Sequence, residues 1–388
     1  MSIRRMMLFT LIGNLFKDII ASFKNRVIND SGTFEAETNL ENQLNTLGSN
    51  LFDSASLVIT PNGVKTSKLY AIKPEDGSGD LVVTRATTAT RVNESGVIVD
   101  VPANVARIDY STGSPAILVE PQRTNLVYPS NVATTQVRAV TAVQYTLSFY
   151  GTGTVTLSGA FSGSLVGTGA NNRVSLTFTP IAGNLTLTVS GSVANWQLEA
   201  GSNATSLIKT ISGSVTRNAD VISNTNASTL IGQTEGTIFI DYNKILANDG
   251  IRNIISINDG STKNLIEIWD GAGSGNLGRI IYTYFANKEI KSSDFGQSTI
   301  SPSGRYKICL TYTITPSLVN FKFFINGVKL DDRNLTYTAF SNPLTRINIG
   351  NRNGTNVGVG SHNLDFILKT RITDAQAIQL TTLWEFIN

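Results

Sequence analysis

The chain has 388 residues, which is too long for one ordinary domain and suits two or three, each large enough to bury a hydrophobic core. Charged residues make up only 15% of the chain, against roughly 25% in an average soluble domain. The net charge of +3 comes from Lys and Arg spread along the chain rather than gathered into a basic run, which argues against a nucleic-acid partner.

Cysteine and histidine are both rare. The single cysteine, Cys309, excludes an intramolecular disulfide framework, and with His362 as the single histidine the chain lacks obvious soft metal ligands. We therefore expect neither a cofactor nor a metal ion. The 33 glycines and the abundant Thr, Ser, Asn and Val predict a mainly β protein, because β-branched residues fit a pleated surface and Gly and Asn allow tight turns.

The N-terminal stretch has helical periodicity. Between residues 6 and 27, apolar side chains recur at spacings of three and four, which predicts a helix with a wide apolar stripe. A signal peptide would share the leading Arg4 and Arg5, but no clear small-residue cleavage site follows. A membrane span would need about 20 apolar residues, and Asn14, Lys17 and Asp18 interrupt this one. We favour a short bundle or coiled coil between identical chains, which buries the stripe.

A second helix is expected to follow, ending near Gly48, because apolar residues between 34 and 47 keep roughly helical spacing. Residues 1–50 are thus expected to form a helical anchor for oligomerisation. From Leu51 the pattern changes to the alternation and turns of strands. The acidic turn at 76–80 resembles a calcium loop only in part, since it lacks the closing glutamate of an EF-hand, and we expect a plain turn there.

Several motifs between residues 25 and 128 resemble a module of structural and tail-fibre-like proteins of phages that infect Bacteroidota, crAss-like phages among them. They are FDSASLVITPN (52–62), DGSGDL (76–81), RATTATRVN (85–93) and LVEPQRTNL (118–126). The resemblance implies a β-rich attachment module at 51–128 in a fibre-like or spike-like appendage of the virion, on its head or its tail.

The resemblance continues into the next block. WQLEAGSNATSLI (196–208) followed by VTRNAD (215–220) is similar to the exit of a small carbohydrate-binding-module-like sandwich in phage tail proteins. Upstream of this exit, segments 145–150, 153–158, 173–179 and 185–190 alternate with period two, which is typical of strands with one buried face. A small β-sandwich is therefore expected at 129–216, without an assumption that it binds sugar.

Residues 217–388 form the third block. The segment NFKFFINGVKL (320–330) predicts a hairpin, because Asn326-Gly327 tolerates the positive φ angles of a type I′ turn. Thr373 and Gln376 predict a capping box at the start of a closing helix. The hairpin, the strand at 346–350 and this helix are similar to a concanavalin A-like or laminin G-like domain, which implies a jelly roll of two packed antiparallel sheets.

A lectin-like block suggests adhesion to a host surface polysaccharide. Trp269 alternates with Ile266 and Ile268 along a strand, so its indole should face away from the core and can stack on a sugar ring. The alternative is that Trp269 packs against a neighbouring domain or chain, and that the loop amides only make turns. The candidate carbohydrate-binding residues are Glu267, Trp269, Asp270, Asn351, Arg352, Asn353 and His362.

An enzyme is the less favoured hypothesis. A glycoside hydrolase needs two carboxylates across a cleft, yet Leu265 and Trp269 flank Glu267 on its own strand face. No G-x-S-x-G elbow accompanies His362. Two further alternatives stay open, a purely structural capsid or tail decoration and a secreted bacterial lectin or adhesin.

The expected partners follow from these hypotheses. An apolar stripe left exposed at 6–27 would promote aggregation, so we expect self-association or docking to other virion proteins through the N-terminal segment. Resemblance to phage fibres implies a homotrimer in the virion, and no membrane span is expected. Copies of a weak lectin-like site on one particle would raise the effective concentration for a host glycan steeply.

Overall fold

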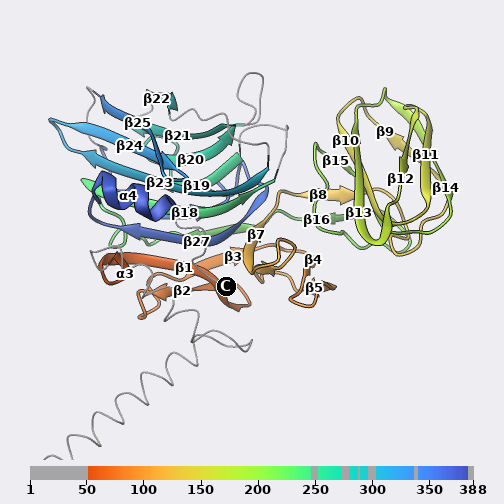
Figure 1. Cartoon of the computed structure of the whole chain (residues 1–388), viewed down its shortest axis with the longest axis horizontal. Coiled ribbons are helices and arrows are strands. Elements are labelled where there is room, and N and C mark those ends of the chain that lie inside the picture. Colours follow the sequence, from red (N-terminus) through yellow and green to blue (C-terminus); the bar gives the residue numbers. More distant parts are fainter. Residues whose placement is uncertain are drawn as a thin grey trace, which may run out of the picture.

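The computed structural model describes residues 51–245, 252–271, 279–286, 289–295, 303–335 and 340–382. The helical anchor expected at 1–50 lies outside these residues. The described chain is mainly β, as the composition predicts, and forms a large and a small sandwich (Figure 1). No helix in this part of the chain is both long and apolar enough to cross a membrane.

One extended antiparallel sheet builds the large sandwich. From edge to edge it runs through β22 (Glu289–Phe295), β21 (Arg279–Ala286), β20 (Leu265–Gly271), β19 (Arg252–Asn258), β26 (Arg346–Ile349), β17 (Val221–Asn224), β3 (Leu81–Thr84), β2 (Lys68–Lys73), β1 (Ala55–Lys65), β27 (Gly360–Leu368), β18 (Glu235–Lys244), β23 (Gly304–Ile314), β24 (Val319–Ile325) and β25 (Val328–Leu335). β7 (Ala116–Val119) pairs with β27, and β6 (Arg107–Asp109) pairs with β7.

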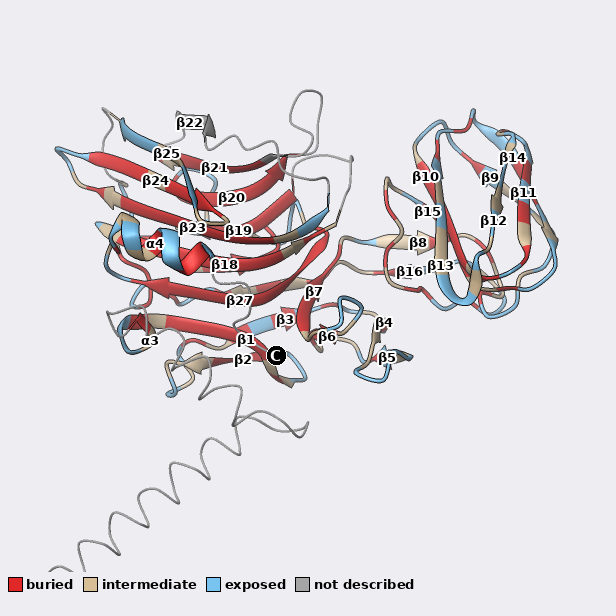
Figure 2. Ribbon diagram, viewed as in Figure 1, coloured by how far each residue is buried: buried red, intermediate tan, exposed pale blue. Residues whose placement is uncertain are grey.

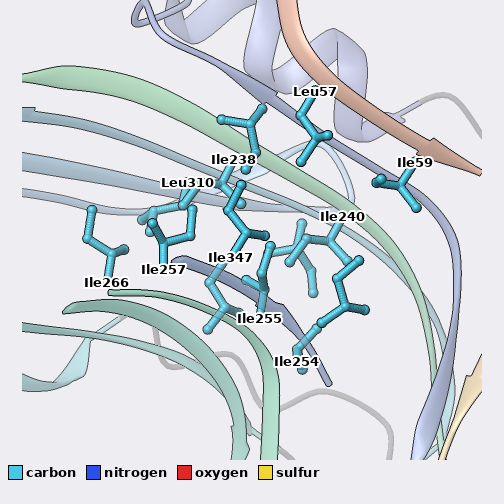
Figure 3. Packing of buried hydrophobic residues seen from close by; sticks show 14 of the residues in the cluster. Leu57, Ile59, Ile238, Ile240, Ile254, Ile255, Ile257, Ile266, Leu310 and Ile347 are labelled. Carbon is cyan, nitrogen blue, oxygen red and sulfur yellow. The ribbon is translucent and has the colours of Figure 1, made fainter. Parts of the chain in front are cut away.

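The two halves of this sheet face each other across a core of aliphatic and aromatic side chains. Ile255 and Ile257 of β19 and Ile266 of β20 lie opposite Ile240 of β18 and Leu310 of β23 (Figure 3). All five side chains are at most 1% exposed. Burial of apolar surface stabilises a folded protein by about 25 cal/mol per Å². This core is therefore the main stabilising contribution to the sandwich.

A second apolar cluster lies on the other face of β27, β18, β23 and β24. It includes Phe239, Phe366 and Cys309, and it is covered by α3 (Leu51–Ser54) and α4 (Asp374–Thr382). One side of α4 is buried and the other side is exposed (Figure 2). The predicted capping box is confirmed, because Gln376 N donates to Thr373 Oγ1 at 3.3 Å and Gln376 Oε1 accepts from Thr373 N at 2.9 Å.

The predicted hairpin is also confirmed. β24 and β25 are joined through Asn326 and Gly327, whose φ angles are +47° and +79°. Both values lie in the left-handed region that a type I′ turn requires.

The small sandwich has two sheets around Trp196, which is fully buried. One sheet has the order β13 (Gly169–Phe178), β10 (Tyr145–Gly151), β15 (Val193–Ala200), and the other β12 (Gly163–Val166), β11 (Thr154–Gly159), β14 (Gly183–Ser190), β9 (Gln136–Val140). The segments predicted to alternate fall on β10, β11, β13 and β14. β8 (Arg123–Asn125) pairs with β16 (Val215–Arg217) and links the two sandwiches (Figure 1).

The strand pairing differs from the division into blocks expected at residues 128 and 217. β1 pairs with β27, β3 pairs with β17, and β7 pairs with β27, so the segment 51–119 supplies strands to the same sheet as 221–368. The hairpin β4 (Ala89–Val92) and β5 (Ile98–Val101) lies beside them. The small sandwich is therefore inserted between two parts of one larger sandwich.

A buried network of charged side chains closes the junction between the sandwiches. Glu120 is 2.7 Å from Arg107 Nη1 and 2.6 Å from Arg217 Nη1, and Asp220 pairs with Arg107 and, at 2.7 Å, with Arg85. These five side chains are at most 3% exposed. Two of the motifs that resemble the phage module, 85–93 and 118–126, thus meet the later motif at 215–220 in one network.

The carboxylates of the acidic turn at 76–80 accept hydrogen bonds from the turn and from β2. Asp76 Oδ1 accepts hydrogen bonds from Ser78 N and Ser78 Oγ, and Asp80 accepts from Ala71 N and Lys68 Nζ. Asp76 thus stabilises the turn itself, whereas Asp80 attaches it to β2.

Candidate functional site

Three neighbouring strands, β20, β19 and β26, carry polar side chains on the face turned away from the inter-sheet core. Their isoleucines belong to the core, whereas Ser256, Glu267 and Asn348 alternate with them and occupy the opposite face. Ser256 pairs in register with Glu267 on one side and with Asn348 on the other. We call this group of residues the β20 face, in which Ser256, Glu267 and Asn348 are at most 1% exposed. Its residues are Asn253, Ser256, Glu267, Trp269 and Asn348, with Arg352 and Asn353 from the following loop.

Glu267 and Arg352 form the charged centre of the β20 face. Arg352 reaches from the loop after β26 across β19 and pairs with Glu267 through Nε, at 2.5 Å, and through Nη2. The carboxylate is fully buried, while the arginine side chain keeps 20% of its surface exposed. Such a two-point pair fixes the plane of the guanidinium. Nη1 of Arg352 has no partner in the part of the chain that the structure describes.

The loop that carries Arg352 is held by its asparagines. Asn351 is fully buried and donates to Ile222 O at 3.1 Å and Ile349 O at 2.9 Å, so it is a structural residue of the loop. Asn353, at φ +47°, accepts from Asn348 Nδ2 at 3.4 Å through its side-chain oxygen. Its amide nitrogen makes no hydrogen bond to the described residues, so it is a second donor beside Arg352.

Trp269 lies next along β20, on the same face as Glu267. Its indole Nε1 donates to Thr283 Oγ1 at 2.7 Å, and the residue is 8% exposed, so little of it reaches the surface. Its cross-strand neighbour Asn253 is fully buried, and neither atom of its amide has a hydrogen-bond partner among the described residues. Buried polar groups are nearly always paired, so this amide points to a bound water or ligand group.

Two of the residues predicted for the site lie elsewhere. Asp270 pairs with Lys244 of β18 at 2.5 Å, and it alternates with Trp269, so it faces the opposite sheet instead of the β20 face. Desolvation raises the pKa of Asp270, and the charge of Lys244 opposes that rise. Its grouping with Trp269 is therefore wrong, because neighbours on a strand point to opposite faces.

His362 is also separated from the β20 face. It lies on β27, in the opposite half of the large sheet, where it is 1% exposed and stacks edge-on against Tyr242. The register shifts between Asp241 and Tyr242, which turns His362 toward the interior and toward Asp365 at 2.9 Å. For this reason, the closeness of His362 in sequence to the loop at 351–356 does not place it at the β20 face.

Sequence reasoning missed Asn253, Ser256 and Asn348. The signal was present in the segment NIISIN (253–258), where polar residues interrupt a run of isoleucines, and in RINI (346–349). Period-two alternation places these polar residues on one face, but only the pairing of β20, β19 and β26 brings them together.

Comparisons with known proteins give distant likenesses. No protein-family model and no curated protein matches the sequence. Among solved structures, the CBM40 of the Ruminococcus gnavus IT-sialidase is 17% identical with a TM-score of 0.34, over 40% of this chain and 86% of that one. The binding domain of botulinum neurotoxin serotype G is 15% identical with a TM-score of 0.31, over 42% of this chain and 40% of that one. These likenesses are too distant to identify a ligand.

Proposed function

We propose that this protein binds a host surface glycan through the β20 face and serves as a fibre-like or spike-like appendage of a bacteriophage particle. The observation that carries the glycan-binding part is the Glu267–Arg352 pair, which holds a partly exposed guanidinium rigidly beside the Asn353 amide. Fixed donors on the loop beside these strands are suited to the hydroxyl groups of a sugar.

The charges of the β20 face favour binding over catalysis. Glu267 is neutralised by Arg352, and the nearest carboxylate in sequence, Asp270, is neutralised by Lys244 on the other face of the strand. A glycosidase would need two carboxyl groups facing one substrate bond. The two acids of β20 cannot do so from opposite faces.

The virion part of the proposal rests on the sequence motifs. The motifs at 85–93, 118–126 and 215–220 supply Arg85, Glu120, Arg217 and Asp220 to the junction network. Their resemblance to the phage module thus concerns residues with a definite structural role. A single lectin-like site is weak, but many copies on one particle would give strong attachment.

Binding of the full chain, multimerised on beads, to cells of Bacteroidota hosts tests this proposal. We expect saturable binding that purified surface polysaccharide competes away. Arg352→Ala should weaken binding about 10-fold or more, because hydrogen bonds to a charged group are lost. Glu267→Gln should weaken it less, since the shape of the anchor is kept.

Arg333→Ala provides the matched control. Like Arg352, Arg333 is an arginine paired with an acidic residue on a strand, here Asp331, but it lies on β25 at the far edge of the large sheet. We expect this variant to bind like the unmodified chain. Equal binding by the Arg352 and Arg333 variants would refute the β20 face, and no binding to any susceptible host would favour a purely structural decoration.

A further inference from the structure

Lys244 and Asp270 form an ion pair inside the large sandwich. Lys244 follows Ile240 and Tyr242 of the core along β18 at a spacing of two. Asp270 follows Ile268 of the core along β20 at the same spacing. Because alternate residues of a strand share one face, both charged side chains point between the two halves of the large sheet. The pair therefore bridges strands that belong to different halves.

The amine and the carboxyl group of this pair are in contact and shielded from water. Lys244 Nζ lies 2.5 Å from Asp270 Oδ1, and each of the two side chains keeps only 2% of its surface exposed. The other carboxyl oxygen, Oδ2, is buried and accepts no hydrogen bond in the part of the chain that the structure describes. A buried ion pair is stable only when further hydrogen bonds satisfy the remaining atoms of both ions, so this pair is incompletely satisfied.

The buried surroundings favour uncharged forms of the two groups. Desolvation raises the pKa of Asp270, and the charges of Lys244 and Arg252 oppose that rise without cancelling it. Transfer of one proton from the ammonium to the carboxylate removes both charges, and burial favours this neutral pair over two ions. A neutral amine is a nucleophile and a carboxylic acid is an electrophile, whereas an ammonium and a carboxylate do not react with each other.

We propose that Lys244 and Asp270 are joined by an intramolecular amide bond, which cross-links the two halves of the large sheet covalently. The nitrogen lone pair of the neutral amine attacks Cγ of the protonated carboxyl group, so that the Nζ–Cγ bond forms and one Cγ–O bond breaks. The hydroxyl group leaves with one hydrogen of the amine as a water molecule. No atom is oxidised or reduced, so no further reactant is needed. The fold supplies the fixed contact between the two groups that lets them react.

The amide bond would act as a staple across the large sandwich. Its two residues are 26 positions apart, so it closes a loop that contains β19 and constrains the unfolded chain as a disulfide does. With Cys309 as its single cysteine, the chain cannot form an intramolecular disulfide for this purpose. The bond would keep the two halves of the sheet together in an exposed appendage, and it does not depend on glycan binding by the β20 face.

Mass spectrometry of the purified full chain under denaturing conditions tests the cross-link. We expect the intact chain to be lighter than its unmodified sequence by about 18 Da, the mass of one water molecule. Trypsin cuts after unmodified lysine, so we expect no cut after Lys244 and a branched peptide that contains both Lys244 and Asp270. Lys244→Arg and Asp270→Ala should each have the full mass of their sequences, because each variant lacks one of the two reactive groups.

Two other lysine–aspartate pairs of the same chain serve as internal controls. Lys209 contacts Asp100 at 2.8 Å, but these side chains are 49% and 64% exposed, so water stabilises both ions. Lys307 is buried beside Asp241, but the two groups are 3.9 Å apart and Arg305 holds both oxygens of Asp241. We therefore expect trypsin to cut after Lys209 and after Lys307.

Three results would overturn the cross-link. The first is an intact chain with the full mass of its sequence. The second is a loss of water with a normal cut after Lys244, which would indicate another reaction, such as formation of a cyclic imide at Asp270-Gly271. The third is the same loss of water in Lys244→Arg. None of these results bears on cell attachment through Arg352, so the failure of one proposal does not imply the failure of the other.

Discussion

At the scale of single residues, Glu120 joins three distant segments of the chain. It accepts hydrogen bonds from Arg107, Arg217 and Ser206, and all these groups lie in the closed junction. Desolvation by itself would raise the pKa of Glu120, but Arg217 and Arg107 beside it lower that pKa below its usual range. The residue is therefore ionised in the folded protein at neutral pH.

Removal of this carboxylate should be strongly destabilising. Glu120→Ala leaves Arg107 and Arg217 with one buried partner fewer, and we expect a loss of about 3–5 kcal/mol in the free energy of unfolding. Asp100→Ala is the control, because Asp100 forms an exposed pair with Lys209 and should cost less than about 1 kcal/mol. Urea denaturation measures the free energy of unfolding of both variants. Equal losses in the two variants would contradict the structural role of Glu120.

The low pKa of Glu120 also predicts a dependence of stability on pH. A carboxyl group whose pKa is lower in the folded than in the unfolded state stabilises the fold above the unfolded pKa, about 4.3 for Glu, and loses that contribution as pH falls below it. Stability should therefore decline on acidification below about pH 4.3. The decline should be shallower in Glu120→Gln, and an equal slope in the two proteins would argue against this assignment.

At the scale of elements, local patterns predicted local structure well. The Asn326-Gly327 hairpin and the capping box at Thr373 depend on residues that are close in sequence, and both are present. The partners of β1 could not be predicted in the same way. Ser56 donates to Ile367 O across 311 positions, and an alternating strand does not specify which remote strand it pairs with.

The same limitation explains the outcome for the β20 face. Alternation assigned Glu267 and Trp269 to one face, but the grouping of Asp270 and His362 with them relied on proximity in sequence. A β-bulge turned His362 inward, and strand geometry turned Asp270 to the other side. Asn253 was missed because its importance follows only from its burial without a partner.

The topology predicts which fragments fold. Residues 217–388 alone lack β1, β2, β3 and β7, which lie within or beside the large sheet, so this fragment should not unfold cooperatively. Replacement of 126–214 by an Asn-Gly turn should instead give a folded, less stable protein, because Asn125 and Val215 are cross-strand partners and two residues can close the β8–β16 hairpin. Thermal unfolding followed by circular dichroism compares them, and cooperative unfolding of 217–388 would refute the shared sheet.

At the scale of the whole molecule, the chain consists of two sandwiches, a buried network of charged side chains at their junction and an N-terminal segment expected to associate. The strands β20, β19 and β26 support the β20 face. Association of several chains would place several copies of this weak site on one particle and so strengthen attachment to a polysaccharide.

Self-association is predicted to depend on residues 1–50. The full chain should have a mass in solution of about three times the 41.7 kDa of one chain, and a chain that starts at residue 51 should be monomeric. Light scattering after size exclusion measures both masses. A mass of one chain for the intact protein would rule out the trimer.

The central claim is that the β20 face binds a host glycan. Its most direct test is a crystal structure of the full chain with an oligosaccharide from the polysaccharide that competes for cell attachment. We predict electron density for a sugar on the β20 face, with hydroxyl groups within hydrogen-bond distance of Arg352 Nη1 and Asn353 Nδ2. A bound oligosaccharide that leaves both groups untouched would contradict the claim.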